Sequence, residues 1–280
     1  MKSIWGVKVE QDDDFEQNNK PEQCYLFELE FSDYTPSGLG TAHLSGFALA
    51  SDEMEYAVKG TGGNTPFPVQ NPTQVPAAEW FCTNLAERCG IATPVCKILK
   101  CVSNNEYVFG SRIEHAAWKS GLSDSQWIQL LSSASDSLKK QLWAIYAFDQ
   151  FVHNVDRHLN NYLYMHNSRG QVIVKTFDFS LSSFVLGWPR STSITLPSDS
   201  TTRINWQIVK MLIGDTDELR KVSLNVLDKL EMIGVNAVSD ILNTMPGEWL
   251  PPMQKDFILR WWDNLEKIER LNAIRLEITS

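Results

Sequence analysis

The sequence predicts an α+β protein with a β-rich first part and a mainly helical second part. Up to residue 113, several segments alternate apolar and polar residues, as half-buried strands do. Past Glu114, apolar residues recur every three or four positions, which is the helical period. We therefore expect two lobes, 1–113 and 114–280, with the boundary between Ile113 and Ala117.

The first lobe is expected to contain six strands and one helix. The alternation is clearest where apolar residues at 27, 29 and 31 are separated by two glutamates. The helix should begin at Pro76, because a proline in the first turn forfeits no hydrogen bond, and end near Gly90, a residue suited to a C-terminal cap. The strands are expected at 2–9, 24–31, 41–50, 54–59, 94–102 and 106–113.

The second lobe is expected to be helical apart from one hairpin. Apolar residues from Leu138 to Val152 keep the helical period and run directly into a polar loop at Asp156. A β-rich run ending at Asp178 predicts a hairpin after this loop. Further helices are expected at 204–214, 216–232, 235–243 and 252–277.

Composition excludes several classes of protein. The 25 basic and 34 acidic residues give a net charge of −9, which argues against a dedicated nucleic-acid binder. No apolar run approaches the roughly 18 residues of a membrane helix, and the first residues lack the apolar core of a signal peptide. The five cysteines lack paired spacing, and we interpret Cys82 and Cys89, which fall on one helical face, as buried core thiols and not metal ligands. These observations predict a cytoplasmic protein without membrane or nucleic-acid partners.

Asp156, Asn161 and Asp178 are the most specific functional signal. Asp156 and Asn161 lie five residues apart after a helix, and Asp178 ends the following β-rich run. In protein kinases, an aspartate accepts the proton of the substrate hydroxyl, while an asparagine and a second aspartate hold Mg²⁺ against the phosphates of ATP. The order helix, loop, hairpin, aspartate predicts this chemistry and the two-lobed protein-kinase-like fold. The alternative is an unrelated helix cap and a turn after a strand.

Lys59 and Glu79 are candidates for the phosphate-binding pair of such an enzyme. Lys59 ends a predicted strand, where kinases place the lysine that contacts the phosphates. Glu79 falls at the flank of the apolar stripe of the next helix, from which it could face the cleft and pair with Lys59. A solvated Lys59 at a strand edge and a solvated Glu79 are the alternatives.

Two glycine-rich turns could cradle phosphates, because close approach of backbone N–H groups requires glycine. Gly38 and Gly40 precede Lys59, which is the order expected of a phosphate loop. The second turn, 60–64, is equally rich in glycine but follows the lysine. A plain hairpin turn is the alternative for both.

The motifs resemble those of the HipA-like serine/threonine kinase family, in particular its shorter members. The family's catalytic loop, N-x-D-x-H-x-x-N, is matched by residues 154–161, its lysine strand by 56–60, and its helix with the following segment by 77–94. The resemblance spans about Gly38 to Ser180. It implies that Asp156 is the base, that Asn161 and Asp178 hold Mg²⁺, and that backbone groups near Ser111 and Ile113 meet adenine.

The same resemblance implies ATP as cofactor, serine or threonine of a protein as acceptor, and a toxin role with an antitoxin partner. The chain is shorter than full-length HipA toxins, which puts the antitoxin and the known toxin targets in question. A small-molecule or phosphoinositide kinase and a nucleotide-binding module without turnover are the alternatives. Self-phosphorylation at Ser37, or within 180–202, is a further expectation.

Overall fold

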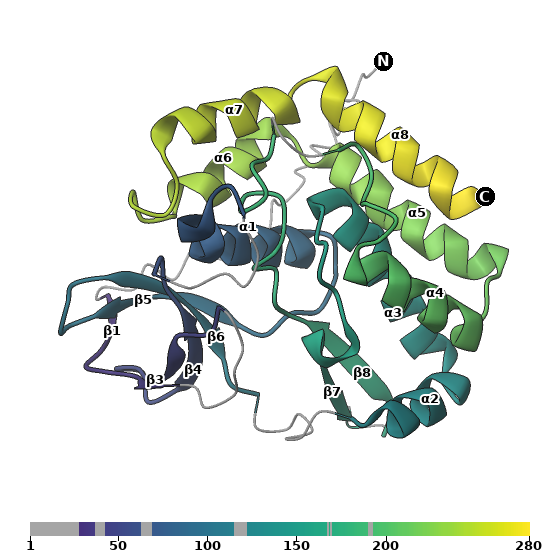
Figure 1. The fold of residues 1–280 in the computed structure, drawn as a ribbon, viewed down its shortest axis with the longest axis horizontal. Helices are drawn as coiled ribbons and strands as arrows, with labels where there is room; N and C mark the ends of the chain where they lie inside the picture. Colours follow the sequence, from purple (N-terminus) through teal and green to yellow (C-terminus); the bar gives the residue numbers. More distant parts are fainter. Residues whose placement is uncertain are drawn as a thin grey trace, which may run out of the picture.

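A computed structural model describes residues 28–36, 43–62, 69–114, 122–166, 168, 170–189 and 193–280. The chain forms a six-stranded sheet with a long helix against it, followed by a mainly helical part that includes a two-stranded hairpin (Figure 1). The predicted α+β fold, with strands first and helices second, is confirmed.

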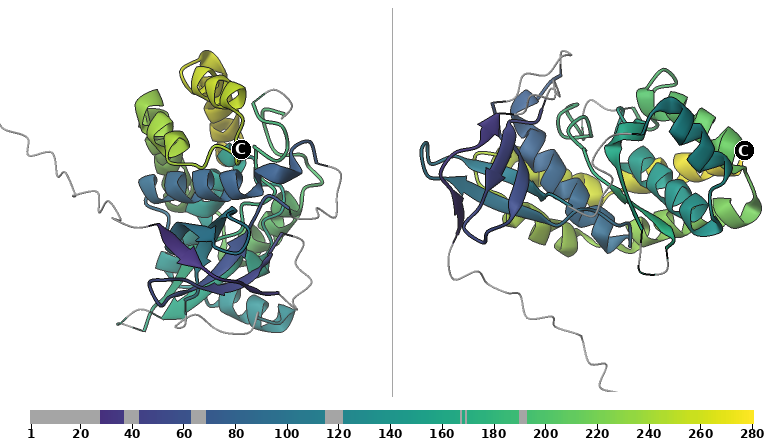
Figure 2. Two further views of the ribbon diagram at one scale, coloured as in Figure 1. Left: turned by 90° about the vertical axis from the view of Figure 1, so that its left-hand side faces the viewer. Right: turned by 90° about the horizontal axis from the view of Figure 1, so that it is seen from below.

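The sheet has the strand order β1-β5-β6-β4-β3-β2, in which β1 is parallel to β5 and the other pairs are antiparallel. Side chains on one of its faces form a small core around Val58 and Leu99. The sheet is strongly curled when seen from the side (Figure 2). Its strands are β1 (Leu29–Phe31), β2 (Thr35–Pro36), β3 (Gly46–Leu49), β4 (Glu55–Lys59), β5 (Cys96–Cys101) and β6 (Tyr107–Arg112).

Helix α1 (Val75–Arg88) covers the other face of the sheet, after a short turn, η1 (Pro72–Gln74). Neighbouring residues of β6 point to opposite faces, so Val108 joins the small core while Phe109 packs with α1. Phe81 of α1 belongs to the large core cluster that continues through the helical part. Helix α1 therefore packs against both parts, and the division at residue 113 stays a prediction.

The helical part is built around α3, which packs against α5, α8 and the hairpin strand β8. Ser135 begins α3, because its hydroxyl accepts the Leu138 N–H and caps the first turn. The elements are α2 (Asp124–Ser132), α3 (Asp136–Val152), η2 (Leu159–Asn161), β7 (Tyr162–His166), β8 (Val172–Thr176), α4 (Thr201–Ile213), α5 (Asp217–Met232), α6 (Val235–Asn243), α7 (Pro252–Trp262) and α8 (Leu265–Thr279).

The prediction of a single helix over 252–277 was wrong, because α7 and α8 are separated at Asp263 and Asn264. Asn264 has an extended backbone, with φ −114° and ψ 169°, and its side chain accepts the Leu265 N–H. The helical period runs on across this break because both helices bury side chains in the same core.

Other strand and helix boundaries also differ from the prediction. The strand expected at 41–50 is β3 alone, four residues long. The strand expected at 2–9 lies outside the described residues, as does most of the one expected at 24–31. The sequence analysis missed β2 and α2. In the described part of the chain, no helix is both long and apolar enough to cross a membrane, and the cytoplasmic location stays a prediction.

Candidate active site

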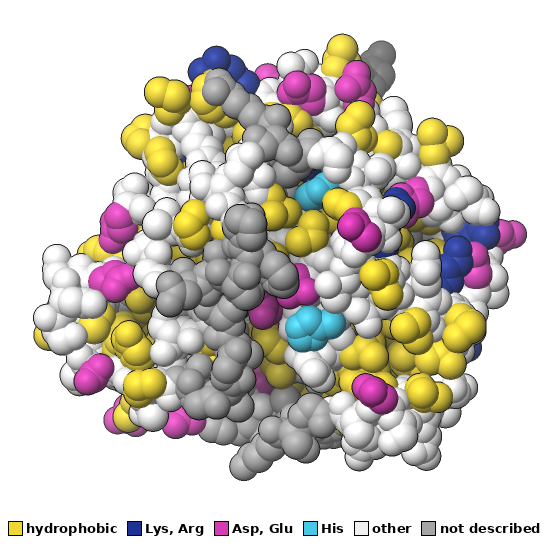
Figure 3. All heavy atoms as spheres, viewed as in Figure 1, with side chains coloured by type: hydrophobic (Ala, Val, Ile, Leu, Met, Phe, Trp, Pro, Cys, Tyr) yellow, Lys and Arg dark blue, Asp and Glu magenta, His cyan; other side chains and the backbone are white. Residues whose placement is uncertain are grey.

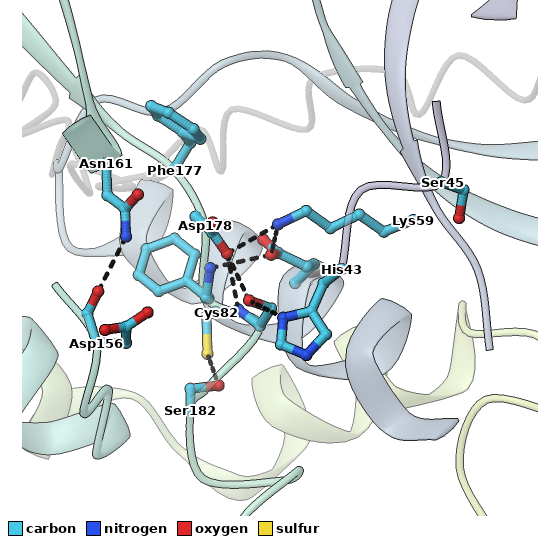
Figure 4. A network of polar contacts seen from close by, with 12 residues as sticks. His43, Ser45, Lys59, Cys82, Asp156, Asn161, Phe177, Asp178 and Ser182 are labelled. Carbon is cyan, nitrogen blue, oxygen red and sulfur yellow. Dashed lines mark hydrogen bonds and ion pairs between the residues drawn. The ribbon is translucent and has the colours of Figure 1, made fainter. Parts of the chain in front are cut away.

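Lys59, Glu79 and Asp178 form a buried ion cluster between the sheet and the helical part. Lys59 ends β4, Glu79 lies on α1 and Asp178 follows β8. The Nζ atom of Lys59 lies 2.5 Å from Glu79 Oε1 and 2.8 Å from Asp178 Oδ1. Glu79 is only 2% exposed, and its Oε1 also accepts the Phe179 N–H at 3.0 Å. One cation thus joins three distant segments of the chain (Figure 4).

Burial and charge act in opposite directions within this cluster. Burial alone would raise the pKa of Asp178, but Lys59 lowers that pKa well below its ordinary value. Burial opposes the charge of Lys59, yet the carboxylates of Asp178 and Glu79 raise its pKa. The pKa of Glu79 is raised by burial, against the effect of Lys59. At neutral pH, Lys59 and Asp178 therefore carry opposite charges in a site that is largely shielded from water.

The two oxygens of the Asp178 carboxylate differ in their contacts with the described residues. Every contact that it makes with described residues falls on Oδ1, from Lys59 and from the hydroxyl and N–H of Ser180. Its backbone has a positive φ of 62°, an uncommon conformation for a residue with a side chain. The Asp178 side chain is 29% exposed. The Oδ2 atom is therefore available to a ligand that enters the cleft.

Asn161 offers a second oxygen near the loop that follows α3. Its Nδ2 atom donates to the Asp156 carbonyl at 3.0 Å, so the nitrogen of the amide faces Asp156 and the oxygen faces away. In Figure 4, Asp178 lies between the pair Asp156–Asn161 and the Lys59 side chain. Carboxylate and amide oxygens are ligands that Mg²⁺ accepts. Asn161 and Asp178 thus fit a magnesium ion by the chemistry of their side-chain oxygens.

A buried ion pair holds the Asp156 loop in place. The Arg157 side chain donates from Nε to Asp149 Oδ2 at 2.8 Å and from Nη2 to Asp149 Oδ1 at 2.9 Å. Its Nη1 donates to the carbonyl oxygens of Asn161 and Phe177. Asp149 lies in α3, and Phe177 immediately precedes Asp178. The Arg157 guanidinium therefore connects the helix, the Asp156 loop and the segment that carries Asp178.

The remaining predicted site residues either lie outside the described part of the chain or take part in the hydrogen bonds of the sheet. Gly38, Gly40 and Ser37 lie outside the described residues. Ser111 pairs with strands on both of its sides, as part of β6. The Ile113 N–H donates to the Glu55 carbonyl at 2.8 Å, so it extends the sheet and is not available to adenine in this conformation.

On the face shown in Figure 3, acidic side chains and a histidine gather at the middle of the molecule, where the sheet meets the helical part. Residues 47–184 match the family model described as HipA-like kinase. The matched segment includes β3, β4, α1, the Asp156 loop and Asp178. This chain belongs to the HipA-like kinase family.

Two solved structures resemble this HipA-like kinase at low sequence identity. The kinase CtkA of Helicobacter pylori, described as proinflammatory, matches with a TM-score of 0.55 and 13% identity, over 90% of this chain and 98% of CtkA. HipA of Shewanella oneidensis, solved with HipB and operator DNA, matches with a TM-score of 0.46 and 10% identity, over 79% of this chain and 60% of HipA. No curated protein matches the sequence. The CtkA likeness shows the two-lobed kinase-like fold.

Sequence analysis missed four residues that shape this site. Asp149 is fully buried on the otherwise apolar face of α3, and such a charge indicates a buried partner. That partner is Arg157, which belongs to the matched loop motif but was given no role. His43 and Ser180, which contact each other beside Asp178, carried no sequence signal because 137 residues separate them.

Proposed function

We propose that this HipA-like kinase transfers the γ-phosphoryl group of ATP to a hydroxyl, with Lys59 contacting the phosphates and Glu79 orienting Lys59. The ion cluster of these two residues with Asp178 is the observation that carries the proposal. Lysine on a strand of the small lobe, paired with a helix glutamate, is the arrangement that active protein kinases use. The Lys59–Asp178 contact of 2.8 Å supports this role, because it sets the cation beside the aspartate proposed to hold the metal.

Mg²⁺ is the proposed metal, held by Asn161 and Asp178. The ion would neutralise charge that develops on the phosphates during transfer. In this proposal, Lys59 attracts the phosphates. Arg157 holds the backbone of Asn161 and of the segment before Asp178 in place through hydrogen bonds to their carbonyl oxygens. Asp156 is proposed to accept the proton of the acceptor hydroxyl, because it lies five residues before Asn161 and its carbonyl accepts a hydrogen bond from the Asn161 side chain.

Serine or threonine of a protein is the acceptor that we propose, on the strength of the family. A small-molecule or phosphoinositide acceptor and nucleotide binding without turnover are the alternatives. By the same family resemblance, a toxin role and an antitoxin partner are proposed.

Ser180 is an unfavourable site of self-phosphorylation in this conformation, because it is only 4% exposed and its hydroxyl is bonded to Asp178.

Radiolabelled ATP tests the proposal. The purified protein is incubated with [γ-³²P]ATP, Mg²⁺ and a cell lysate, and label is followed by gel and by lipid extraction. We expect label in protein, and none with the Asp156→Asn variant. Label in the lipid extract would move the acceptor to phosphoinositides. Nucleotide binding without label in either fraction would support the module without turnover.

A further inference from the structure

His43 and Ser180 connect the loop before β3 to the segment that carries Asp178. His43 lies three residues after Gly40 in sequence, and Ser180 lies two residues after Asp178. The His43 Nδ1 atom lies 3.0 Å from Ser180 Oγ, and that oxygen lies 2.6 Å from Asp178 Oδ1 (Figure 4). His43 is only 7% exposed. A small-lobe histidine thus reaches Asp178 through one hydroxyl.

The direction of both hydrogen bonds follows from the chemistry of the three groups. Asp178 is paired with Lys59 and ionised, so its oxygen can only accept. The single hydrogen of the Ser180 hydroxyl must therefore point to Asp178. Ser180 Oγ can then only accept from the histidine, which assigns a hydrogen to His43 Nδ1. The chain of donors runs from His43 to Ser180 to Asp178.

Stability of the fold does not explain a histidine at position 43. Its second nitrogen, Nε2, is buried without a partner in the described part of the chain. Leaving such an atom unsatisfied costs more free energy than one hydrogen bond typically contributes. Buried polar atoms without partners are uncommon in folded proteins, and each one calls for an explanation. Here the contact orients the hydroxyl that bonds to Asp178.

We propose that His43 is a positioning residue for Asp178. Through Ser180, it holds Oδ1 of the carboxylate so that Oδ2 faces the cleft and can bind the metal of a metal–nucleotide complex. Since His43 is on the loop of the first part and Ser180 on the helical part, the contact also couples that loop to the metal site. The inference rests on the proposed role of Asp178 as a metal ligand.

Calorimetry with a non-hydrolysable ATP analogue, with Mg²⁺ and with EDTA, tests this role. We expect His43→Ala and Ser180→Ala each to raise the dissociation constant of the magnesium complex by about 3- to 10-fold, which is the weight of one hydrogen bond. In EDTA, both variants should bind as the wild type does. His43→Asn should recover most of the loss, because its amide nitrogen takes the place of Nδ1 and can donate to Ser180.

Two further variants make the test specific. The double variant His43→Ala/Ser180→Ala should bind no more weakly than the worse single variant, because both changes break the same chain of contacts. His166→Ala on β7 is the matched control, since His166 is exposed and its Nδ1 lies 3.1 Å from the Gly170 carbonyl of the same hairpin. Thermal unfolding of each variant shows that it is folded.

The outcomes separate this inference from the proposed function. Wild-type binding that requires Mg²⁺ and is lost in Asp178→Asn supports the metal role. Given that result, any one of three outcomes overturns the positioning role. These are that His43→Ala binds the magnesium complex like His166→Ala, that the losses of the two single variants add in the double variant, or that His43→Ala weakens binding in EDTA as much as binding with Mg²⁺. Wild-type binding that does not depend on Mg²⁺, or that survives in Asp178→Asn, overturns both proposals.

Discussion

Arg157 and Asp149 face each other across the end of α3 as a two-pronged ion pair, with their side chains 4% and 0% exposed. The pair joins the last turns of the helix to the loop that carries Asp156. Burial opposes the charge of Arg157, but Asp149 raises its pKa further above an already high value. The loop geometry is therefore set by a charged pair that water barely reaches.

Arg157→Met should destabilise the protein by about 3–5 kcal/mol, because it leaves the buried carboxylate of Asp149 without its partner. The double variant Asp149→Leu/Arg157→Met should be more stable than the sum of the single changes, since no charge is left unpaired. Urea unfolding measures both. Arg275→Met is the control, because Arg275 pairs with surface carboxylates on α5. A loss no larger than that of the control would contradict the prediction.

Lys59→Met should lower kcat/KM by about 10²- to 10³-fold, the usual effect of removing one group that stabilises transition-state charge. Glu79→Gln should have a smaller effect, because Asp178 still holds the lysine in the cleft. Steady-state rates of ATP consumption measure this. Lys100→Met on β5, which removes an exposed ion pair with Glu28, should leave the rate unchanged. Equal rates for Lys59→Met and Lys100→Met would show that Lys59 has no part in the chemistry.

Asp156→Asn and Asp178→Asn should separate binding from chemistry. Loss of a base acts mainly on the transition state, so Asp156→Asn should abolish turnover and leave binding of the magnesium–nucleotide complex largely intact. Loss of a metal ligand's charge acts on the ground state as well, so Asp178→Asn should weaken binding too. Calorimetry and rate measurements on both variants decide this. Full activity with equal binding in both would refute the assignment of the motif.

His153 should make the protein less stable in weak acid. Burial, aided by Arg270, lowers the pKa of His153 to about 4, whereas the unfolded chain has a value near 6.5. Between these values the unfolded chain binds a proton that the folded protein does not. The contribution of His153 to the free energy of unfolding is therefore complete above pH 6.5. It declines as the pH falls toward 4, by about 3 kcal/mol in total.

Urea unfolding between pH 7.5 and 5 measures this decline against the variant His153→Asn. Asparagine is suitable because His153 ends α3 with a left-handed backbone, φ 56°, which asparagine tolerates. The variant should lose less stability over this range than the wild type. Parallel pH profiles for His153→Asn and the wild type would exclude His153 as the source.

The local part of the fold was readable from the sequence because it depends on neighbours along the chain. The period of apolar residues located α3, α5 and α6 to within a few positions, and the order of helix, loop, hairpin and aspartate placed Asp156, Asn161 and Asp178. The same period could not show the break at Asn264, since helices on both sides of it bury side chains in one core.

Contacts between distant polar groups were decided by the tertiary structure alone. A helical wheel left Glu79 either solvated or paired, and only the packing of α1 on the sheet brings it to 2.5 Å from Lys59. Nothing in the sequence joins His43 to Ser180. Periodicity tells which face of an element is buried, but the identity of a buried charge's partner depends on which elements meet in space. The sequence by itself determined most of the helices and strands and the motif, and their packing determined the cluster around Asp178.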